Sequence, residues 1–209
     1  MVEADEGGQR HSAKLVDLAE LQPGASVLDV GGGYGEPSLT AARKIGPEGR
    51  VVCTDISPEM LAVARERAAD ADLINVEFVA RDAEELEFDD ESFDAVLSRA
   101  TLMFLPDVAG TLKRLHGFLR VEGRFAATVW GPQPVVQFSA AFPVIAQELA
   151  LSPPPPGRPG AFALSRPIGL PNSRPGPGSE MLRPARCRSS SRPSRPSSTP
   201  SSSVTSPPS

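Results

Sequence analysis

The sequence predicts an α/β fold, with a Rossmann-like, doubly wound and mostly parallel sheet followed by a disordered C-terminal tail. Three observations lead to this prediction. Short apolar runs alternate with segments of helical character from about residue 12 to about residue 130, the first run leads straight into a glycine-rich loop, and the composition changes after Leu151. Strand followed by helix, repeated along the chain, is typical of a parallel sheet covered on both faces.

Five short apolar runs are predicted to be buried strands, because each has the length of a strand and is bounded by turn residues. They occupy residues 26–30, 51–55, 76–80, 93–98 and 125–130. Helical segments are expected at residues 39–46, 57–69 and 106–120. In the second of these, Ser57 is the expected N-cap and Pro58 occupies the first turn. The acidic segment 81–92 is expected to be a solvated loop.

Composition divides the chain into a globular domain at residues 1–151 and a Pro/Ser/Arg-rich tail at residues 152–209. The first part carries 13 Lys and Arg against 25 Asp and Glu, a net charge of −12, whereas the second carries 8 Arg and one acid, a net charge of +7. The second part also holds 15 Pro and 15 Ser. Such a segment buries too little apolar surface to offset its ordering entropy, so we expect disorder.

The acidic first part argues against a nucleic-acid-binding surface, which needs clustered Lys and Arg, and leaves small molecules as the expected partners. Cys53 and Cys187 are the only cysteines and lie far apart, so neither a disulfide framework nor a metal site is expected. The polar N-terminus lacks the apolar core of a signal peptide, and no run reaches the roughly 18 apolar residues of a membrane span. We therefore expect a cytoplasmic protein with no integral membrane segment.

The most informative segment is VLDVGGGYGE at 27–36, where a strand leads into glycines and then into a helix. Gly31, Gly33 and Gly35 keep a G-x-G-x-G spacing. Glycine permits a tight turn and a close approach of ligand to backbone, and the following helix N-terminus offers N–H groups. Asp55 ends the next strand, where a doubly wound sheet places a carboxylate that accepts both hydroxyls of a ribose. The pattern favours a nucleotide-type cofactor over a plain strand-to-helix turn.

From roughly Leu15 to Trp130 the chain resembles the class I S-adenosylmethionine-dependent methyltransferases, in particular the small-molecule branch that includes quinone methyltransferases. The resemblance rests on the glycine loop, DISPEML at 55–61, RDAEEL at 81–86, FDAVLSR at 93–99 and RFAATVW at 124–130. It implies a methyltransferase that uses S-adenosyl-L-methionine as its cofactor and methylates a small-molecule acceptor.

The resemblance also implies roles for residues near the first two strands. Asp55 is expected to bind the ribose of the cofactor, with Ile56 and Met60 against the adenine. The methionine part is expected to be held by the end of the first strand and the glycine loop, at Asp29, Gly31, Gly32, Gly33 and Gly35.

The third and fourth strands are expected to complete the cofactor site. Asp82 and Ala83 are expected to face the adenine amino group. Ser98, just past the fourth strand, is expected to line the reacting edge. No catalytic base is assigned, because His116 is expected to be a surface or packing residue on a helix and His11 to lie in a flexible N-terminus.

Two departures from the family concern the C-terminal half. LRVEGR at 119–124 stands where the family usually has a Pro-Gly turn, so a strained turn is expected before the fifth strand. The family's sheet normally ends with two further strands, and residues 166–209 are expected to supply neither, which would leave the sheet edge open. One hypothesis is that the tail results from a frame change in the gene, and the alternative is a genuine disordered tail.

Two other functions remain open at this stage. An NAD(P)-dependent oxidoreductase shares the loop and the acid, but its G-x-G-x-x-G pattern needs glycine where this chain has Glu36, and it has no use for Asp82. The other is a non-catalytic, truncated methyltransferase-like protein that binds the cofactor weakly. The methyl acceptor, the atom that is methylated and the oligomeric state are not predicted.

Overall fold

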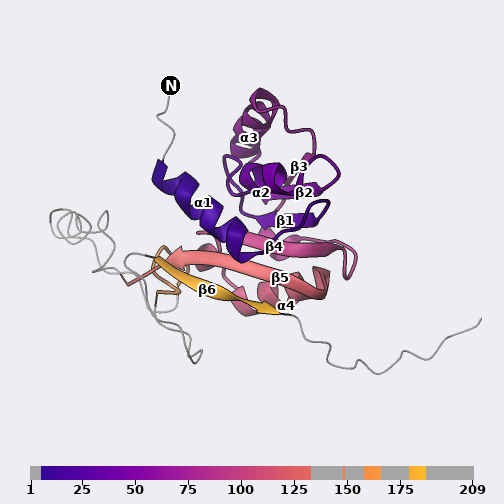
Figure 1. The fold of residues 1–209 in the computed structure, drawn as a ribbon. Helices are drawn as coiled ribbons and strands as arrows, with labels where there is room; N and C mark the ends of the chain where they lie inside the picture. Colours follow the sequence, from indigo (N-terminus) through magenta and orange to yellow (C-terminus); the bar gives the residue numbers. More distant parts are fainter. Residues whose placement is uncertain (1–5, 133–147, 149–157, 166–178, 187–209) are drawn as a thin grey trace, which may run out of the picture.

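The computed structural model describes residues 6–132, 148, 158–165 and 179–186, which form an α/β fold around one sheet (Figure 1). The strand order is β3-β2-β1-β4-β5-β6. The first five strands run parallel, which confirms the predicted doubly wound sheet, and the sixth is antiparallel to β5. The strands are β1 (Ser26–Val30), β2 (Arg50–Asp55), β3 (Val76–Ala80), β4 (Phe93–Arg99), β5 (Leu119–Trp130) and β6 (Ser179–Arg186).

Three helices lie where the sequence pattern predicts them, to within two residues at each end, whereas the N-terminal helix and the two short 3-10 helices were not predicted. Helix α3 begins as expected, because the Ser57 hydroxyl accepts a hydrogen bond from the Met60 N–H at 3.2 Å and Pro58 occupies the first turn. The helices of the described residues are α1 (Glu6–Leu18), α2 (Ser38–Ile45), α3 (Pro58–Asp70), α4 (Val108–Phe118) and the short 3-10 helices η1 (Ala83–Glu85) and η2 (Leu102–Phe104).

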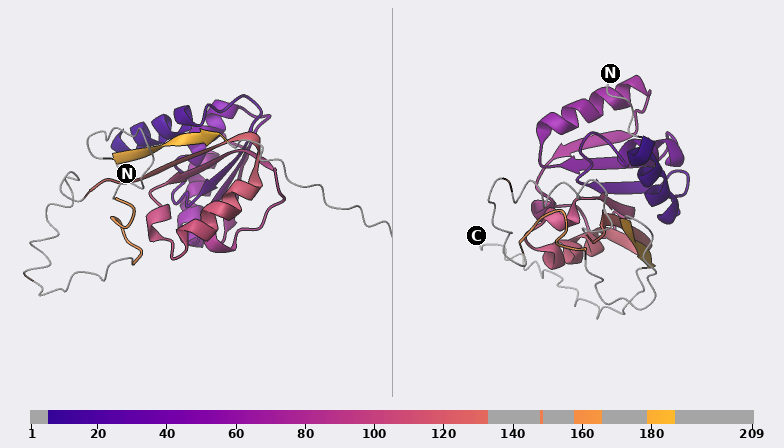
Figure 2. Two further views of the ribbon diagram at one scale, coloured as in Figure 1. Left: turned by 90° about the horizontal axis from the view of Figure 1, so that it is seen from below. Right: turned by 90° about the vertical axis from the view of Figure 1, so that its left-hand side faces the viewer.

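Helices cover both faces of the sheet, with α1 and α4 on opposite sides (Figure 2). Successive strand residues point to opposite faces, so Val27 and Val51 pack with α1 and α2, whereas their neighbours Leu28 and Val52 pack with α4. This two-sided burial explains why the strands appear in the sequence as continuous apolar runs. The chain winds from β1 toward β3 in one direction and from β4 toward β6 in the other, so a crevice is expected at the carboxyl ends of β1 and β4.

The acidic segment 81–92 is not simply a solvated loop, and that expectation is wrong in part. Leu86 is only 1% exposed, and the ring of Phe88 meets the rings of Phe93 and Phe118 edge-on, with centroids 5.1 and 5.5 Å apart. The acids alternate with these apolar residues, so the segment can bury one side and expose its charges on the other.

Strand β5 begins six residues earlier than its apolar run, so the strained turn that was expected before the strand is instead a strained bulge within it. Phe93 pairs with Leu119 and Ala95 pairs with Arg124, so residues 120–123 bulge out of the ladder. Glu122 has a φ of 66°, a left-handed conformation that a non-glycine residue seldom adopts.

Two pieces of the expected tail are structured. Residues 179–186 pair antiparallel with β5, Ser179 opposite Trp130 and Arg186 opposite Arg124, so the expectation that residues 166–209 supply no strand is wrong. Unpaired backbone groups at a sheet edge accept a strand with little regard to its side chains, which is why composition gave no signal. Segments 166–178 and 187–209 lie outside the described residues.

Residues 158–165 also belong to the ordered part of the chain. The Gly160 N–H donates to the Met103 carbonyl at 2.8 Å, and Leu164 packs against the cluster that contains Leu102 and Val129. Among the helices that the structure describes, none is both long and apolar enough to cross a membrane.

Candidate functional site

The glycine loop follows β1 and is fastened to the end of β2. Gly31 N–H and Gly32 N–H both donate to the Thr54 carbonyl at 2.9 Å, and Gly33 N–H donates to Asp55 Oδ2 at 2.9 Å. The loop therefore lies at the carboxyl ends of adjacent parallel strands, where doubly wound sheets bind ligands.

Asp55 bridges two loops with one carboxylate. Oδ2 accepts the hydrogen bond from Gly33, and Oδ1 accepts one from the Ser57 N–H at 2.9 Å. A carboxylate has about four acceptor positions, and the side chain is half-buried, so it keeps capacity for further donors. The predicted placement of this acid at the end of the second strand is confirmed.

Asp29 lies beneath the glycine loop and is completely buried. Oδ2 accepts hydrogen bonds from Ser38 Oγ at 2.6 Å and Ser38 N–H at 3.1 Å, whereas Oδ1 is buried without a hydrogen-bond partner among the described residues. Burial raises the pKa of Asp29 to about 7, although the hydrogen bonds from Ser38 and the positive charge of Arg99 act in the opposite direction. An unpaired buried oxygen is costly, so Oδ1 is a natural acceptor for a cationic group.

The space around the loop excludes larger side chains. A Cβ at Gly33, where φ is 52°, would lie 2.9 Å from Met60 Cε, and a Cβ at Gly32 would lie 2.4 Å from Cys53 Sγ. Gly35 closes the turn, since its N–H donates to the Gly32 carbonyl at 2.9 Å. Burial raises the pKa of the Cys53 thiol, which is therefore a packing group at this position.

Apolar and aromatic side chains stand exposed around the loop. Ile56, in the turn after β2, is 70% exposed, and Tyr34, in the glycine loop, is 55% exposed. The Tyr34 carbonyl accepts a hydrogen bond from the Arg67 guanidinium at 2.6 Å, which ties the loop to α3. Met60 is half-buried beside Gly33. Ile56 and Met60 thus offer apolar surface at this end of the sheet, and their contact with an adenine stays a prediction.

Asp82 and Ala83 follow β3, next to the end of β2. The Arg81 N–H donates to the Asp55 carbonyl at 2.9 Å, which joins the two strand ends. Asp82 caps η1, because its Oδ1 accepts from the Glu84 N–H at 2.8 Å. Both Asp82 and Ala83 are half-buried, and Ala83 packs against the α4 side of the core.

Ser98 is the one predicted site residue whose expected position is wrong. It lies inside β4 and is completely buried, and its hydroxyl donates to the Val30 carbonyl at 3.1 Å. Ser98 therefore supports the last residue of β1 from below the loop, and it does not line the surface of the site because its side chain is completely buried.

Three further residues at the site were missed by sequence reasoning. Ser38 anchors Asp29, and Arg99 donates from Nε to the Glu36 carbonyl at 3.2 Å while its charge acts on Asp29. Thr101 donates to the Gly31 carbonyl at 3.2 Å. Arg99 and Thr101 reach the loop only because β4 lies next to β1, which no local pattern indicates.

The histidines do not supply a base at the loop. His116 is an exposed residue of α4, as expected. His11 lies in helix α1 and is exposed, so its expected place in a flexible N-terminus is wrong. We assign no catalytic base among the described residues.

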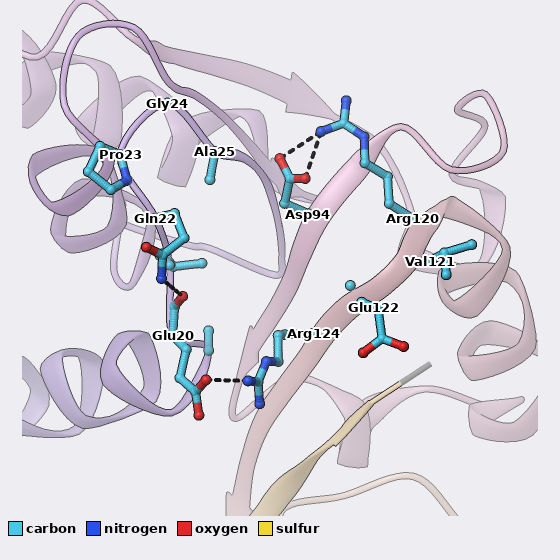
Figure 3. Close-up of a pocket in the computed structure, with 13 residues that line it drawn as sticks. Glu20, Gln22, Pro23, Gly24, Ala25, Asp94, Arg120, Val121, Glu122 and Arg124 are labelled. Atoms are coloured by element: carbon cyan, nitrogen blue, oxygen red, sulfur yellow. Dashed lines mark hydrogen bonds and ion pairs between the residues drawn. The ribbon is translucent and has the colours of Figure 1, made fainter. Parts of the chain in front are cut away.

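A hollow of about 480 Å³ lies at the opposite end of the sheet (Figure 3). Four of its charged groups form two ion pairs: Arg120 contacts both oxygens of Asp94 at 2.7 Å, and Arg124 pairs with Glu20. It lies at the amino ends of the strands, away from the glycine loop, and is therefore not the candidate site. It is lined by residues 19–25, Asp94 and residues 120–124.

The chain matches the family described as methyltransferase domain over residues 21–147. It is 40% identical over 115 residues to aklanonic acid methyltransferase DauC of Streptomyces sp. (strain C5), over 55% of this chain and 52% of that protein. It is 41% identical over 113 residues to a demethylmenaquinone methyltransferase of Listeria monocytogenes serotype 4a (strain HCC23), over 54% and 48%. The chain thus spans about half the length of the curated relatives it matches.

A solved structure with the same fold is phosphoethanolamine N-methyltransferase 2 of Haemonchus contortus in complex with S-adenosyl-L-methionine. It superimposes with a TM-score of 0.55 at 30% sequence identity, over 60% of this chain and 29% of that chain.

Proposed function

The chain belongs to the methyltransferase domain family, and on that basis we propose that it is an S-adenosyl-L-methionine-dependent methyltransferase acting on a small-molecule acceptor. The observation that carries the proposal is the position of Asp55. Its carboxylate closes the glycine loop at the end of β2 and keeps acceptor capacity for the hydroxyls of a ribose.

The residues beneath the loop fit a positively charged donor. When bound, S-adenosyl-L-methionine supplies a methyl group carried on a sulfonium sulfur. Asp29 offers a buried oxygen with no partner among the described residues, and a neighbouring ammonium group would satisfy it and favour the ionised carboxylate. In this proposal the methionine part is held by Asp29 and by the backbone of Gly31, Gly32, Gly33 and Gly35.

The adenosine part is assigned to the ends of β2 and β3. Asp55 accepts hydrogen bonds from the ribose, while Ile56 and Met60 offer apolar surface to the adenine. Asp82 faces the adenine amino group together with Ala83, and only one of its carboxylate oxygens is engaged within the described residues. Ser98 acts indirectly, through its bond to the strand that precedes the loop.

The acceptor is proposed to be a small molecule with an apolar surface. The names of two relatives, aklanonic acid methyltransferase and demethylmenaquinone methyltransferase, support a small-molecule acceptor. Tyr34 and Phe104 are 55% and 53% exposed in the loops after β1 and β4, and exposed aromatic rings favour an apolar partner. The task of the protein is to align donor and acceptor, which can lower the barrier by several kcal/mol.

A cytoplasmic place of action is part of the same proposal. The unpaired thiol of Cys53 is compatible with the reducing conditions of that compartment.

The role of Asp55 is tested by measuring the affinity of the full chain for S-adenosylhomocysteine in equilibrium dialysis. Asp55→Ala removes two charge-assisted hydrogen bonds, one from Gly33 of the glycine loop and one from Ser57, together with the proposed ribose acceptor, so we expect binding at least roughly tenfold weaker. Glu66→Ala, at an exposed position of α3, is the matched control and should bind like the unaltered chain. Equal affinity of the two variants would exclude Asp55 from the cofactor site.

Methyl transfer itself is tested with methyl-labelled S-adenosyl-L-methionine and two acceptors, aklanonic acid and a demethylmenaquinol. We expect label in at least one extracted product, and much less label with Asp55→Ala than with Glu66→Ala. Tight binding of S-adenosylhomocysteine without label in either acceptor would exclude transfer to these two acceptors.

A further inference from the structure

We propose that Thr101 is a positioning residue that couples the glycine loop, on the donor side, to the loop after β4, on the acceptor side. The inference rests on the proposed function, because that function assigns the donor to the glycine loop and uses the exposed Phe104 ring, after β4, for the acceptor. It adds a residue to which neither the sequence pattern nor the family match gives a role.

Thr101 contacts the glycine loop directly. Its Oγ1 lies 3.2 Å from the Gly31 carbonyl and 3.2 Å from the Arg99 carbonyl, and its single hydroxyl proton is shared between these acceptors. A Cβ at Gly31 would lie 2.1 Å from Thr101 Oγ1 and 2.4 Å from Cγ2. The side chain of Thr101 therefore fills the space that a glycine at position 31 leaves, and the two loops touch without an intervening group.

The backbone just before Thr101 is held in an unusual conformation. Ala100 has a φ of 57°, in the left-handed region that non-glycine residues rarely adopt. Its N–H donates to the Thr128 carbonyl of β5 at 2.9 Å, which secures this turn to the sheet. Such strained positions persist where surrounding contacts over-determine them, and they cluster at functional sites. The backbone at the start of the loop that contains Thr101 is therefore fixed to β5.

The segment that follows Thr101, helix η2, connects it to the exposed Phe104 side chain on the proposed acceptor side. Helix η2 is anchored because Leu102 and Met103 are buried and the Met103 carbonyl accepts the Gly160 N–H at 2.8 Å. The Phe104 N–H donates to the Thr101 carbonyl at 2.9 Å, and the Phe104 side chain is exposed. A shift of the Gly31 carbonyl is therefore transmitted through Thr101 to the position of Phe104.

This arrangement matters for transfer, because a methyl group moves only when donor and acceptor are aligned. Thr101 fixes the relation between the loop that holds the donor and the exposed ring beside the acceptor. Two substitutions separate its contacts: Thr101→Val keeps the shape and loses the hydroxyl, whereas Thr101→Ser keeps the hydroxyl and loses the methyl group.

The test is hydrogen exchange of residues 100–107 in the full chain, with and without saturating S-adenosylhomocysteine. In the unaltered chain we expect the ligand to slow exchange of the Phe104 and Leu105 N–H groups. Thr101→Val should lose this ligand-induced slowing, which we expect to be roughly two- to tenfold in exchange rate because one hydrogen bond is involved. The affinity of Thr101→Val for the ligand should change by a smaller factor. Thr101→Ser should retain the slowing, which a purely structural role of the methyl group would not.

Each outcome decides between the claims. Unchanged ligand-induced slowing in Thr101→Val overturns the coupling and leaves the proposed function standing. Should Thr101→Val not unfold cooperatively, Thr101→Ser decides, because loss of the slowing in a folded Thr101→Ser also overturns the coupling. Failure of the unaltered chain to bind S-adenosylhomocysteine overturns the proposed function and the coupling with it.

Discussion

Asp29 and Asp55 both lie at the carboxyl ends of their strands, but they differ in burial and in hydrogen bonding. Asp55 is half-buried and has both oxygens bonded to backbone N–H groups. Asp29 is completely buried and has one oxygen bonded to Ser38 and the other without a partner in the described part of the chain. Burial without full compensation raises the pKa of Asp29 to about 7. We therefore expect the ionisation of Asp29 to change with pH near neutrality.

Asp29→Asn should remove a pH dependence of stability. The folded chain holds the Asp29 proton up to about pH 7, whereas the unfolded chain releases it near the ordinary value of 3.8. The contribution of Asp29 to stability is thus fully present below pH 3.8 and is lost as pH rises through about 7. Relative to the unaltered chain, Asp29→Asn should gain roughly 2 to 3 kcal/mol in unfolding free energy between pH 5 and pH 8. Urea unfolding at both pH values measures this, and an equal difference at both would contradict a raised pKa.

The positions of most candidate site residues at the ends of their strands could be predicted from the sequence, because these positions follow from local order along the chain. The glycines after β1 and Asp55 at the end of β2 are placed by the strand-loop-helix pattern alone. The burial of Ser98 was not predictable in the same way, because its position along the strand does not show whether the side chain reaches the surface of the site. Thr101 and Arg99 were missed because their contacts depend on β4 lying beside β1, a relation between segments about 70 residues apart.

At the scale of elements, the segment between β3 and β4 shows how an acidic composition can conceal a packed element. Leu86 is buried and Phe88 makes edge-on contacts with two other rings, while the acid between them, Glu87, is exposed. Charge counts average over both sides of the segment, so they predict solvation for a stretch that contributes to the core. The alternation of Leu86 and Phe88 with acidic residues is the pattern that predicts a partly buried segment, and a charge count does not detect it.

Leu86→Ala should destabilise the fold by about 2 to 4 kcal/mol, because it leaves a cavity among buried residues of β4 and α4. Glu87→Ala, next to it and exposed, should change the free energy of unfolding by no more than about 0.5 kcal/mol. Chemical denaturation of both variants measures the difference. Similar values for the two would mean that the segment is solvated, as its composition predicts.

The start of β5 could be predicted only in part. The absence of the usual turn residues indicated strain, and Glu122 does adopt a left-handed conformation. The pairing of Phe93 with Leu119 was not predictable, because it skips residues 120–123 and follows no alternation of apolar residues.

For the whole molecule, the alternation of apolar runs and helical segments was sufficient to predict five parallel strands. It was also sufficient to predict that the candidate site lies at the carboxyl ends of these strands. The sixth strand was not predictable. Strand β6 pairs through its backbone with the open edge of β5, and backbone pairing leaves no pattern in the side chains.

The two ends of the sheet differ in chemistry. At the amino ends, Arg120 pairs with Asp94 and Arg124 pairs with Glu20, so both arginines of that hollow are neutralised by carboxylates within it. At the carboxyl ends, Asp29 keeps an oxygen without a partner in the described residues, beneath a loop that admits only small side chains. This contrast places the cofactor proposal at the carboxyl ends.

The most direct test of the cofactor proposal is a calorimetric titration of the full chain with S-adenosylhomocysteine, with NAD as the comparison ligand. Binding of S-adenosylhomocysteine in the micromolar range, with no detectable heat from NAD, is the predicted result, because Glu36 stands where a dinucleotide-binding loop needs glycine. Binding of NAD with equal or higher affinity, or no binding of S-adenosylhomocysteine by the folded chain, would contradict it.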